Sequence, residues 1–124
     1  MIKCYSKNGK DDDVSDYLAE LIKKNKEMGI KALIEILNLP NKYELFNDIK
    51  VMKSGKYKFY ELRVKSKTNI CRFFFIVENP DFIVLLGFTK KTQKTEKNHL
   101  DKVKDIIEDY KLNKITVNFK FDNI

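Results

Sequence analysis

The sequence predicts a single domain of the α+β class, residues 1–124, in which helices and an antiparallel sheet come from different parts of the chain. Apolar residues recur at helical spacing in the first third of the chain and again over residues 98–110, whereas the middle alternates with a period of two. The chain has 124 residues, of which 43% are hydrophobic, so it can bury one core. These observations predict helices flanking a central block of strands.

The first forty residues are predicted to form one strand and two helices. Met1–Ser6 favours a short strand that ends in an Asn-Gly turn, and the acidic run 11–13 provides a helix N-cap. Apolar side chains then recur with helical periodicity as far as about Lys26, and they are Val14, Tyr17, Leu18, Leu21 and Ile22. A second helix is expected from about Gly29 until Pro40 ends it.

The central segment is predicted to be an antiparallel meander of three strands. Lys58–Lys65 alternates, with Phe59, Glu61 and Arg63 on one face, and the segment 66–69 forms a turn into Ile70–Val77. A second turn over 78–81 leads into Phe82–Phe88. The last two strands are the most continuously apolar, so we expect them at the centre of the sheet.

The C-terminal part is predicted to be a loop, a helix and a tail. The lysine-rich segment 89–97 is expected to be a polar loop, and Asn98–Tyr110 shows helical periodicity. Residues 115–121 alternate and could form a closing strand, so 115–124 is either a tail or an extra strand. A cytoplasmic location without membrane association is expected, because no apolar run has the length of a membrane span and the N-terminus lacks an apolar signal-peptide core.

The positive charge is concentrated in the middle of the chain. Residues 50–97 hold 12 basic and 4 acidic side chains, a net charge of +8, while the segments before and after them carry −1 and 0. A polyanion such as nucleic acid is the natural partner of such a segment, because neutralised phosphates release counterions. Cys4 and Cys71 lie far apart and have no paired spacing, which argues against a zinc site or a disulfide framework.

Arg63 and Arg72 are the only arginines in a chain with 23 lysines. They flank the turn 66–69 symmetrically, so we expect them opposite or nearly opposite each other on one face of the hairpin. Arginine suits phosphate because its planar guanidinium can donate two parallel hydrogen bonds. The alternative is an ion pair, for example between Glu61 and one of the arginines.

A second group of candidates follows the last strand of the meander. Crowding of Lys90, Lys91, Lys94 and Lys97 could lower the pKa of one amine, which could then act as a base, while its neighbours stabilise a charged transition state. A solvated basic loop is the plainer interpretation. His99, the only histidine, opens the next helix and could transfer protons, although a lone histidine is more often incidental.

The central segment resembles the toxin signature of the RelE/ParE superfamily, most closely its phage-associated, HigB-like branch. The similar elements are Tyr60-Glu61-Leu62-Arg63, Cys71-Arg72-Phe73, and residues 84–95 with their Lys-Lys-Thr-Gln-Lys-Thr run. The N-terminal Asn-Gly turn and the helix after it are also similar to that branch. The resemblance covers roughly residues 3–110 and implies a RelE-like fold.

The resemblance implies the toxin of a type II toxin–antitoxin module. Its relatives are ribosome-dependent endoribonucleases that cut mRNA through the ribose 2′-hydroxyl without a cofactor or metal. Arg72 falls on the family's catalytic strand arginine, Arg63 on a neighbouring strand arginine, and Lys91 on a basic residue at the end of the last strand. Lys90 and His99 complete the candidate catalytic set, and Lys58, Lys65, Lys94 and Lys97 are candidate RNA-binding residues. The implied partners are a cognate antitoxin, acidic or carrying a helix-turn-helix domain, together with mRNA and the ribosome.

Two departures from the family leave alternatives open. Glu96 stands where many relatives have proline, and the acid–base group that some relatives carry in the following helix has no clear counterpart except His99. A ParE-like inhibitor of DNA gyrase on the same fold, or an RNA-binding protein without catalysis, would also account for the basic segment.

Overall fold

The computed structural model describes residues 1–42, 49–67, 69–90 and 97–120 of the chain. Its elements follow the order β1 (Ile2–Tyr5), α1 (Asp13–Lys24), α2 (Lys26–Leu37), α3 (Leu39–Lys42), β2 (Ile49–Ser54), β3 (Tyr57–Lys65), β4 (Ile70–Glu78), β5 (Asp81–Lys90), α4 (Lys97–Asn113) and β6 (Thr116–Asn118). The predicted α+β class is confirmed, and the arrangement is compatible with a RelE-like fold.

A six-stranded sheet with the order β2-β3-β4-β5-β1-β6 forms the middle layer of the molecule. The expected meander is present as β3, β4 and β5, and β4 and β5 are central as predicted. Two features are additional. The edge strand β2 extends the meander, and β1 pairs in parallel with β5 and antiparallel with β6. The strand expected in 115–121 is thus present, in shorter form, as β6.

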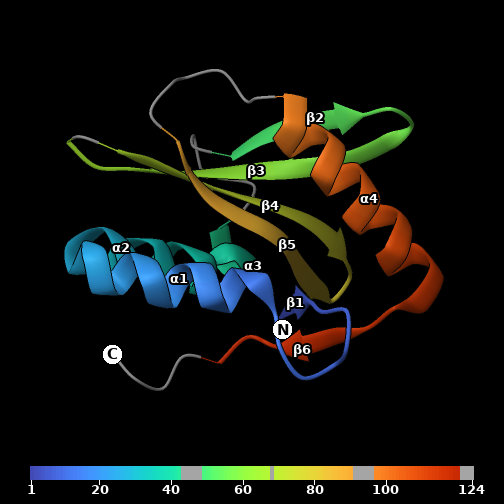
Figure 1. The fold of residues 1–124 in the computed structure, drawn as a ribbon, viewed down its shortest axis with the longest axis horizontal. Helices are drawn as coiled ribbons and strands as arrows, with labels where there is room; N and C mark the ends of the chain where they lie inside the picture. Colours follow the sequence, from blue (N-terminus) through green and yellow to red (C-terminus); the bar gives the residue numbers. More distant parts are fainter. Residues whose placement is uncertain (43–48, 68, 91–96, 121–124) are drawn as a thin grey trace.

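Helices cover both faces of the sheet. Figure 1 shows α1, α2 and α3 on one side and α4 crossing the other. The core between α1, α2 and the sheet contains Leu18, Leu33, Leu62 and Phe73, and the core beneath α4 is built around Phe74 and Ile107. Among the described residues, no helix is both long and apolar enough to cross a membrane.

The helix ends differ in detail from the expected ones. Asp12 is the N-cap of α1 and accepts a hydrogen bond from the backbone N–H of Ser15 at 2.7 Å, as the acidic run predicted. The second helix starts at Lys26 and ends at Leu37, earlier at both ends than expected. Pro40 lies inside the short α3, because the first turn of a helix tolerates a residue without an N–H donor.

The end of the meander is a second correction. Thr89 and Lys90 were expected in a loop, but β5 runs to Lys90, which pairs with Ile70 of β4. The cross-strand ladder of the β4–β5 hairpin therefore outweighs the polar character of these two residues. The remainder of that expected loop, 91–96, lies outside the described residues.

Glu78, at the end of β4, ties the sheet to the C-terminal end of α4. The hydroxyl of Tyr110 donates to Glu78 Oε2 at 2.6 Å, and Lys114 Nζ lies 3.2 Å from Glu78 Oε1. The hydrogen bond from Tyr110 is the main cause that lowers the pKa of Glu78.

We expect Tyr110→Phe to lower the free energy of unfolding by about 1 kcal/mol at about pH 7, because a hydrogen bond to the carboxylate is lost. The folded-state pKa of Glu78 is depressed, so this stabilisation is present above the ordinary value of 4.5 and disappears as the pH falls through the lower folded value. Urea denaturation of both proteins at about pH 7 and about pH 3 checks this. An equal difference at both pH values would contradict the assignment.

Candidate functional site

The two arginines lie side by side on the face of the sheet that α4 covers. Arg63 of β3 is the direct cross-strand partner of Arg72 of β4, so the prediction from the symmetric turn is confirmed. Both are on the same face as Glu61, because residues two apart on a strand point the same way. Two like charges directly opposite each other destabilise a sheet unless an anion lies between them.

Glu61 provides that anion. Its Oε1 accepts a hydrogen bond from Arg63 Nε at 2.8 Å, and its Oε2 lies 3.2 Å from Arg72 Nη1. The ion-pair alternative raised for these residues is therefore present in the structure, and it includes both arginines. A carboxylate held between two guanidinium groups fixes the direction in which each of them points.

The two guanidinium groups differ in access to solvent. The side chains of Arg72 and Glu61 are 0% exposed, whereas that of Arg63 is 22% exposed. Glu61 engages Nε of Arg63, and within the described part of the chain no hydrogen bond occupies the terminal nitrogens of Arg63. Arg63 is consequently the arginine that can present N–H donors to a ligand without rearrangement.

Lys90 and His99 come to the same face from β5 and α4. Lys90 is buried at the end of β5, two residues after Phe88, which is the cross-strand partner of Arg72. The ring of His99, in the first turn of α4, stacks on the ring of Phe88 with centroids 3.8 Å apart and planes 9° apart. The structure thus gathers Glu61, Arg63, Arg72 and Lys90, which we call the cationic cluster, with His99 beside it.

The other candidate residues are distributed differently. Lys65 is exposed at the end of β3, on the same face as Arg63, and Lys97 is exposed where α4 begins. Lys58 lies on the opposite face of β3, five residues from Arg63, which is about 17 Å along a strand. Lys91 and Lys94 fall outside the described residues.

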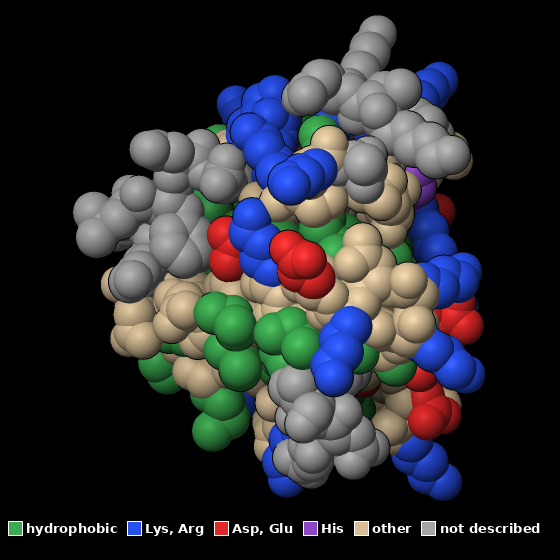
Figure 2. Space-filling view, turned by 90° about the vertical axis from the view of Figure 1, so that its left-hand side faces the viewer, with side chains coloured by type: hydrophobic (Ala, Val, Ile, Leu, Met, Phe, Trp, Pro, Cys, Tyr) green, Lys and Arg blue, Asp and Glu red, His purple; other side chains and the backbone are tan. Residues whose placement is uncertain are grey.

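Positive side chains are also visible around the turn between β3 and β4. Figure 2 shows Lys and Arg side chains in the upper part of the face that includes this turn, above an area of hydrophobic side chains. The described Lys31 contributes here, since its Nζ donates to the carbonyl oxygen of Lys65 at 2.6 Å.

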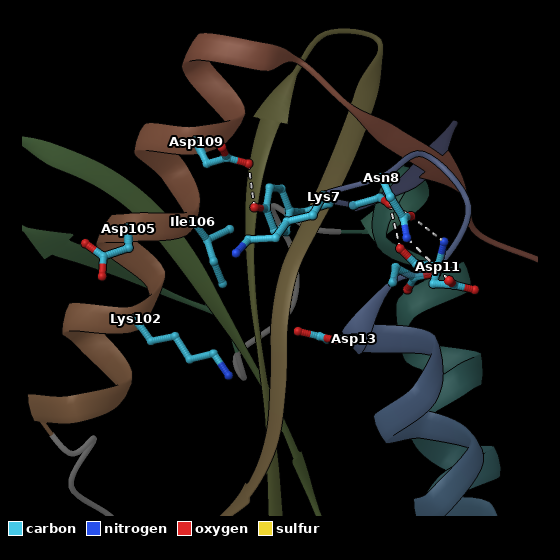
Figure 3. A pocket seen from close by; sticks show the side chains of 11 residues that line it. Lys7, Asn8, Asp11, Asp13, Lys102, Asp105, Ile106 and Asp109 are labelled. Carbon is cyan, nitrogen blue, oxygen red and sulfur yellow. Dashed lines mark hydrogen bonds between the residues drawn. The ribbon is translucent and has the colours of Figure 1, made fainter.

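A separate hollow has the opposite charge. It has a volume of about 490 Å³ and lies between the segment after β1 and helix α4. Figure 3 shows Asp109 on α4 pointing into the hollow, across from the segment that carries Asp11 and Asp13, with the hydrogen bond to Asp109 marked. That bond, 2.6 Å long, comes from the hydroxyl of Tyr5. Its aspartates make this hollow unsuitable for phosphate, so the cationic cluster is the candidate anion site.

Sequence reasoning found the arginines but missed two features of the site. Glu61 was considered as a partner for one arginine, whereas it bridges both. The bridge could have been inferred from two features of the sequence. Glu61 and Arg63 are two residues apart on one strand, and the hairpin register places Arg72 opposite Arg63. Phe88 ends the predicted apolar strand 82–88 and is buried in the core, and no pattern in the sequence indicated that His99 stacks on it.

A metal site would need several Asp, Glu, His or Cys side chains close together. Among residues 1–42, 49–67, 69–90 and 97–120, no group of three or more such side chains is arranged to do so. The cationic cluster supplies guanidinium, amine and carboxylate groups, and His99 adds an imidazole.

Comparison with family models places most of the chain in a known family. The model of the family described as "Phage derived protein Gp49-like (DUF891)" matches residues 16–108, which includes every described residue of the cationic cluster. No curated protein and no solved structure matches the chain significantly. The family match covers more than half of the chain, and the chain belongs to the Gp49-like family of phage-derived proteins, a RelE/toxin-like family.

Proposed function

We propose that this protein is the toxin of a type II toxin–antitoxin module and acts as a ribosome-dependent mRNA endoribonuclease of the HigB-like branch. The observation that carries the proposal is the cationic cluster, in which Arg63 and Arg72 face each other across a hairpin around Glu61. Membership of a toxin-like family supports it. A cytoplasmic location and binding to a cognate antitoxin belong to the same proposal.

In the proposed reaction the ribose 2′-oxygen attacks the adjacent phosphorus while the bond from phosphorus to the 5′-oxygen breaks. The 2′-hydroxyl proton passes to a base on the protein, and the leaving 5′-oxygen receives a proton from an acid. The products are a 2′,3′-cyclic phosphate and a 5′-hydroxyl end. Such a reaction needs in-line positioning of the backbone and stabilisation of the charge that develops on the phosphate oxygens.

Arg63 is assigned to the phosphate, because its side chain is partly exposed and its terminal nitrogens can donate to phosphate oxygens. Arg72 holds Glu61, and Glu61 in turn orients Arg63. Lys90 and His99 are the proposed proton-transfer groups, since Lys90 lies two residues after Phe88, the cross-strand partner of Arg72, and His99 stacks on Phe88. Lys91 is assigned to charge stabilisation, and Lys65, Lys94 and Lys97 to the RNA backbone.

Primer extension on cellular mRNA after induced expression tests this function. We expect discrete cuts within codons of translated messages and no DNA damage. Intact mRNA together with DNA breaks would overturn the proposal in favour of a gyrase inhibitor on the same fold.

One observation favours the alternative without catalysis. Arg72 is 0% exposed and its charge is balanced by Glu61, so the arginine that matches the family's catalytic position does not reach the surface. An RNA-binding protein would show neither cuts nor DNA breaks in the same experiment, but would still retain labelled RNA.

A further inference from the structure

The tip of the β2–β3 hairpin is a second positively charged surface, at the other end of β3 from Arg63. Lys53, Lys58 and Tyr60 point to the face opposite Arg63. Tyr57 shares the face of Arg63, so the surface extends around the tip of the hairpin. Lys53 of β2 and Lys58 of β3 are direct cross-strand partners, and both are exposed. Like charges directly opposite each other on a sheet destabilise it. Replacement of either lysine by a neutral residue would remove this repulsion. An anion bound between the two amines would also offset it.

Aromatic rings lie beneath the lysines of this hairpin. Lys56 Nζ is 5.5 Å from the centroid of the Tyr57 ring, and Lys58 Nζ is 5.9 Å from that of Tyr60. Both tyrosines are partly exposed. Rings alternating with cations are the arrangement that single-stranded nucleic acids use, since bases stack on the rings while phosphates meet the amines.

A cavity opens next to these residues, because two strands separate there. The pairing of β3 with β4 begins at Tyr60 and Phe75, so the first residues of β3 pair only with β2 and the last residues of β4 pair only with β5. The space has a volume of about 350 Å³, and its lining includes Lys56, Tyr57, Lys58, Tyr60, Ile76 and Lys111. It is large enough for a nucleobase and has an apolar wall against which a base can pack.

Helix α4 adds further positive charge and fixes the position of the hairpin. The Ser54 hydroxyl donates to the carbonyl oxygen of Leu100 at 3.2 Å, and the side chain of Lys104 lies against Gly55 in the turn. Figure 1 shows the β2–β3 turn beside α4. Lys111 also lines the cavity, and Glu78, 3.7 Å from its Nζ, is the carboxylate of the lining. The surface is thus built on two packed elements.

We propose that Lys53, Lys56, Tyr57 and Lys58 form a binding surface for single-stranded RNA, which we call the hairpin surface, separate from the cationic cluster. This inference rests on the proposed function, because it assumes that the protein acts on RNA. The hairpin surface would hold that RNA about 17 Å along β3 from Arg63. The hairpin surface binds backbone phosphates through its lysines and stacks a base on Tyr57 or Tyr60. It contributes affinity and leaves bond breakage to the cationic cluster.

Fluorescence anisotropy with a labelled single-stranded RNA that carries 2′-O-methyl riboses tests the hairpin surface, because this RNA binds but cannot be cleaved. We expect the double variant Lys53→Gln/Lys58→Gln to lower the affinity about 10-fold and to reduce the salt slope by about 1.4, since each lost phosphate contact accounts for about 0.7. Tyr57→Ala should lower the affinity by a similar factor through lost stacking.

Lys23→Gln/Lys26→Gln is the matched control, because both lysines are exposed at the α1–α2 junction and the charge change is the same. The control should bind the RNA like the unmodified protein. The hairpin variant should unfold at no lower temperature than the unmodified protein, since a repulsive pair has been removed. Equal loss of affinity in the hairpin variant and the control would overturn the proposal, as would unchanged RNA affinity accompanied by weaker binding of an acidic peptide.

Failure of the proposed function gives a different result. If the chain binds RNA without cutting it, the hairpin variant still loses affinity for the 2′-O-methyl RNA although unmodified RNA stays intact. If the hairpin surface is wrong and the endoribonuclease is right, the hairpin variant binds and cleaves RNA normally.

Discussion

Replacement of Arg63 by glutamine is expected to lower the rate of mRNA cleavage by about 100-fold or more, with little effect on folding. The side chain of Arg63 is partly exposed, and Glu61 accepts a hydrogen bond from its Nε. Among the described residues, none forms a hydrogen bond with its terminal nitrogens. Loss of one donor to a developing oxyanion costs about 100- to 1,000-fold in catalytic rate. Glutamine can still donate a hydrogen bond to Glu61, so the hairpin should remain folded.

The measurement is single-turnover cleavage of an mRNA on programmed ribosomes. Arg63→Lys keeps the charge but not the planar fork, so we expect its rate to lie between those of the glutamine variant and the unmodified protein. Lys23→Gln on α1 removes one exposed positive charge away from the cluster and should cleave normally. Wild-type rates for Arg63→Gln would show that Arg63 does not contact the phosphate.

Replacement of Arg72 by methionine is expected to destabilise the protein by about 3 kcal/mol, the lower end of the range for breaking a buried ion pair. Both Arg72 and Glu61 are completely buried, so the substitution removes one of the two arginines that the described residues place on the carboxylate. The cost stays at the lower end because Arg63 continues to neutralise Glu61.

Urea denaturation of Arg72→Met, Glu61→Leu/Arg72→Met and the unmodified protein measures this effect. Removal of both charges should restore most of the lost stability, because an unpaired buried charge is the source of the penalty. A double variant as unstable as Arg72→Met alone would show that packing rather than charge explains the cost. Because Arg72→Met is expected to destabilise the protein, a loss of growth arrest in this variant would reflect the amount of folded protein as well as its activity. Arg63 is therefore the more informative position for a test of catalysis.

The sequence predicted the fold well where periodicity and turns act locally. Alternation in 58–65 and the short turn 66–69 were enough to place Arg63 opposite Arg72, because the register of a hairpin follows from its turn. The position of β1 could not be predicted in this way. Its parallel pairing with β5 joins residues about eighty positions apart, and no local pattern encodes such a contact.

The sequence predicted which residue types form the site, but it did not predict which of their side chains are buried. Charge counting treated both arginines as surface groups, whereas Arg72 is buried and Arg63 is partly exposed. Burial depends on which elements cover a face, and the packing of α4 against the sheet is a tertiary property. The stacking of His99 on Phe88 has the same origin, since it joins a helix to a strand across the sheet surface.

The place of β1 between β5 and β6 has a consequence for the order in which the chain can fold during synthesis. The hairpins of β2 to β5 are local and can form as soon as they leave the ribosome, but β1, made first, has no sheet to join until β5 exists. It then remains the edge of the sheet until β6, the last of the described elements, pairs with it. A nascent chain that stalls before Thr116 would carry an assembled cationic cluster together with an open strand edge, which invites pairing with another chain. Completion of the C-terminal strand therefore replaces the exposed edge of β1 with the shorter edge of β6. The growing chain gains its charged surface before β1 is covered.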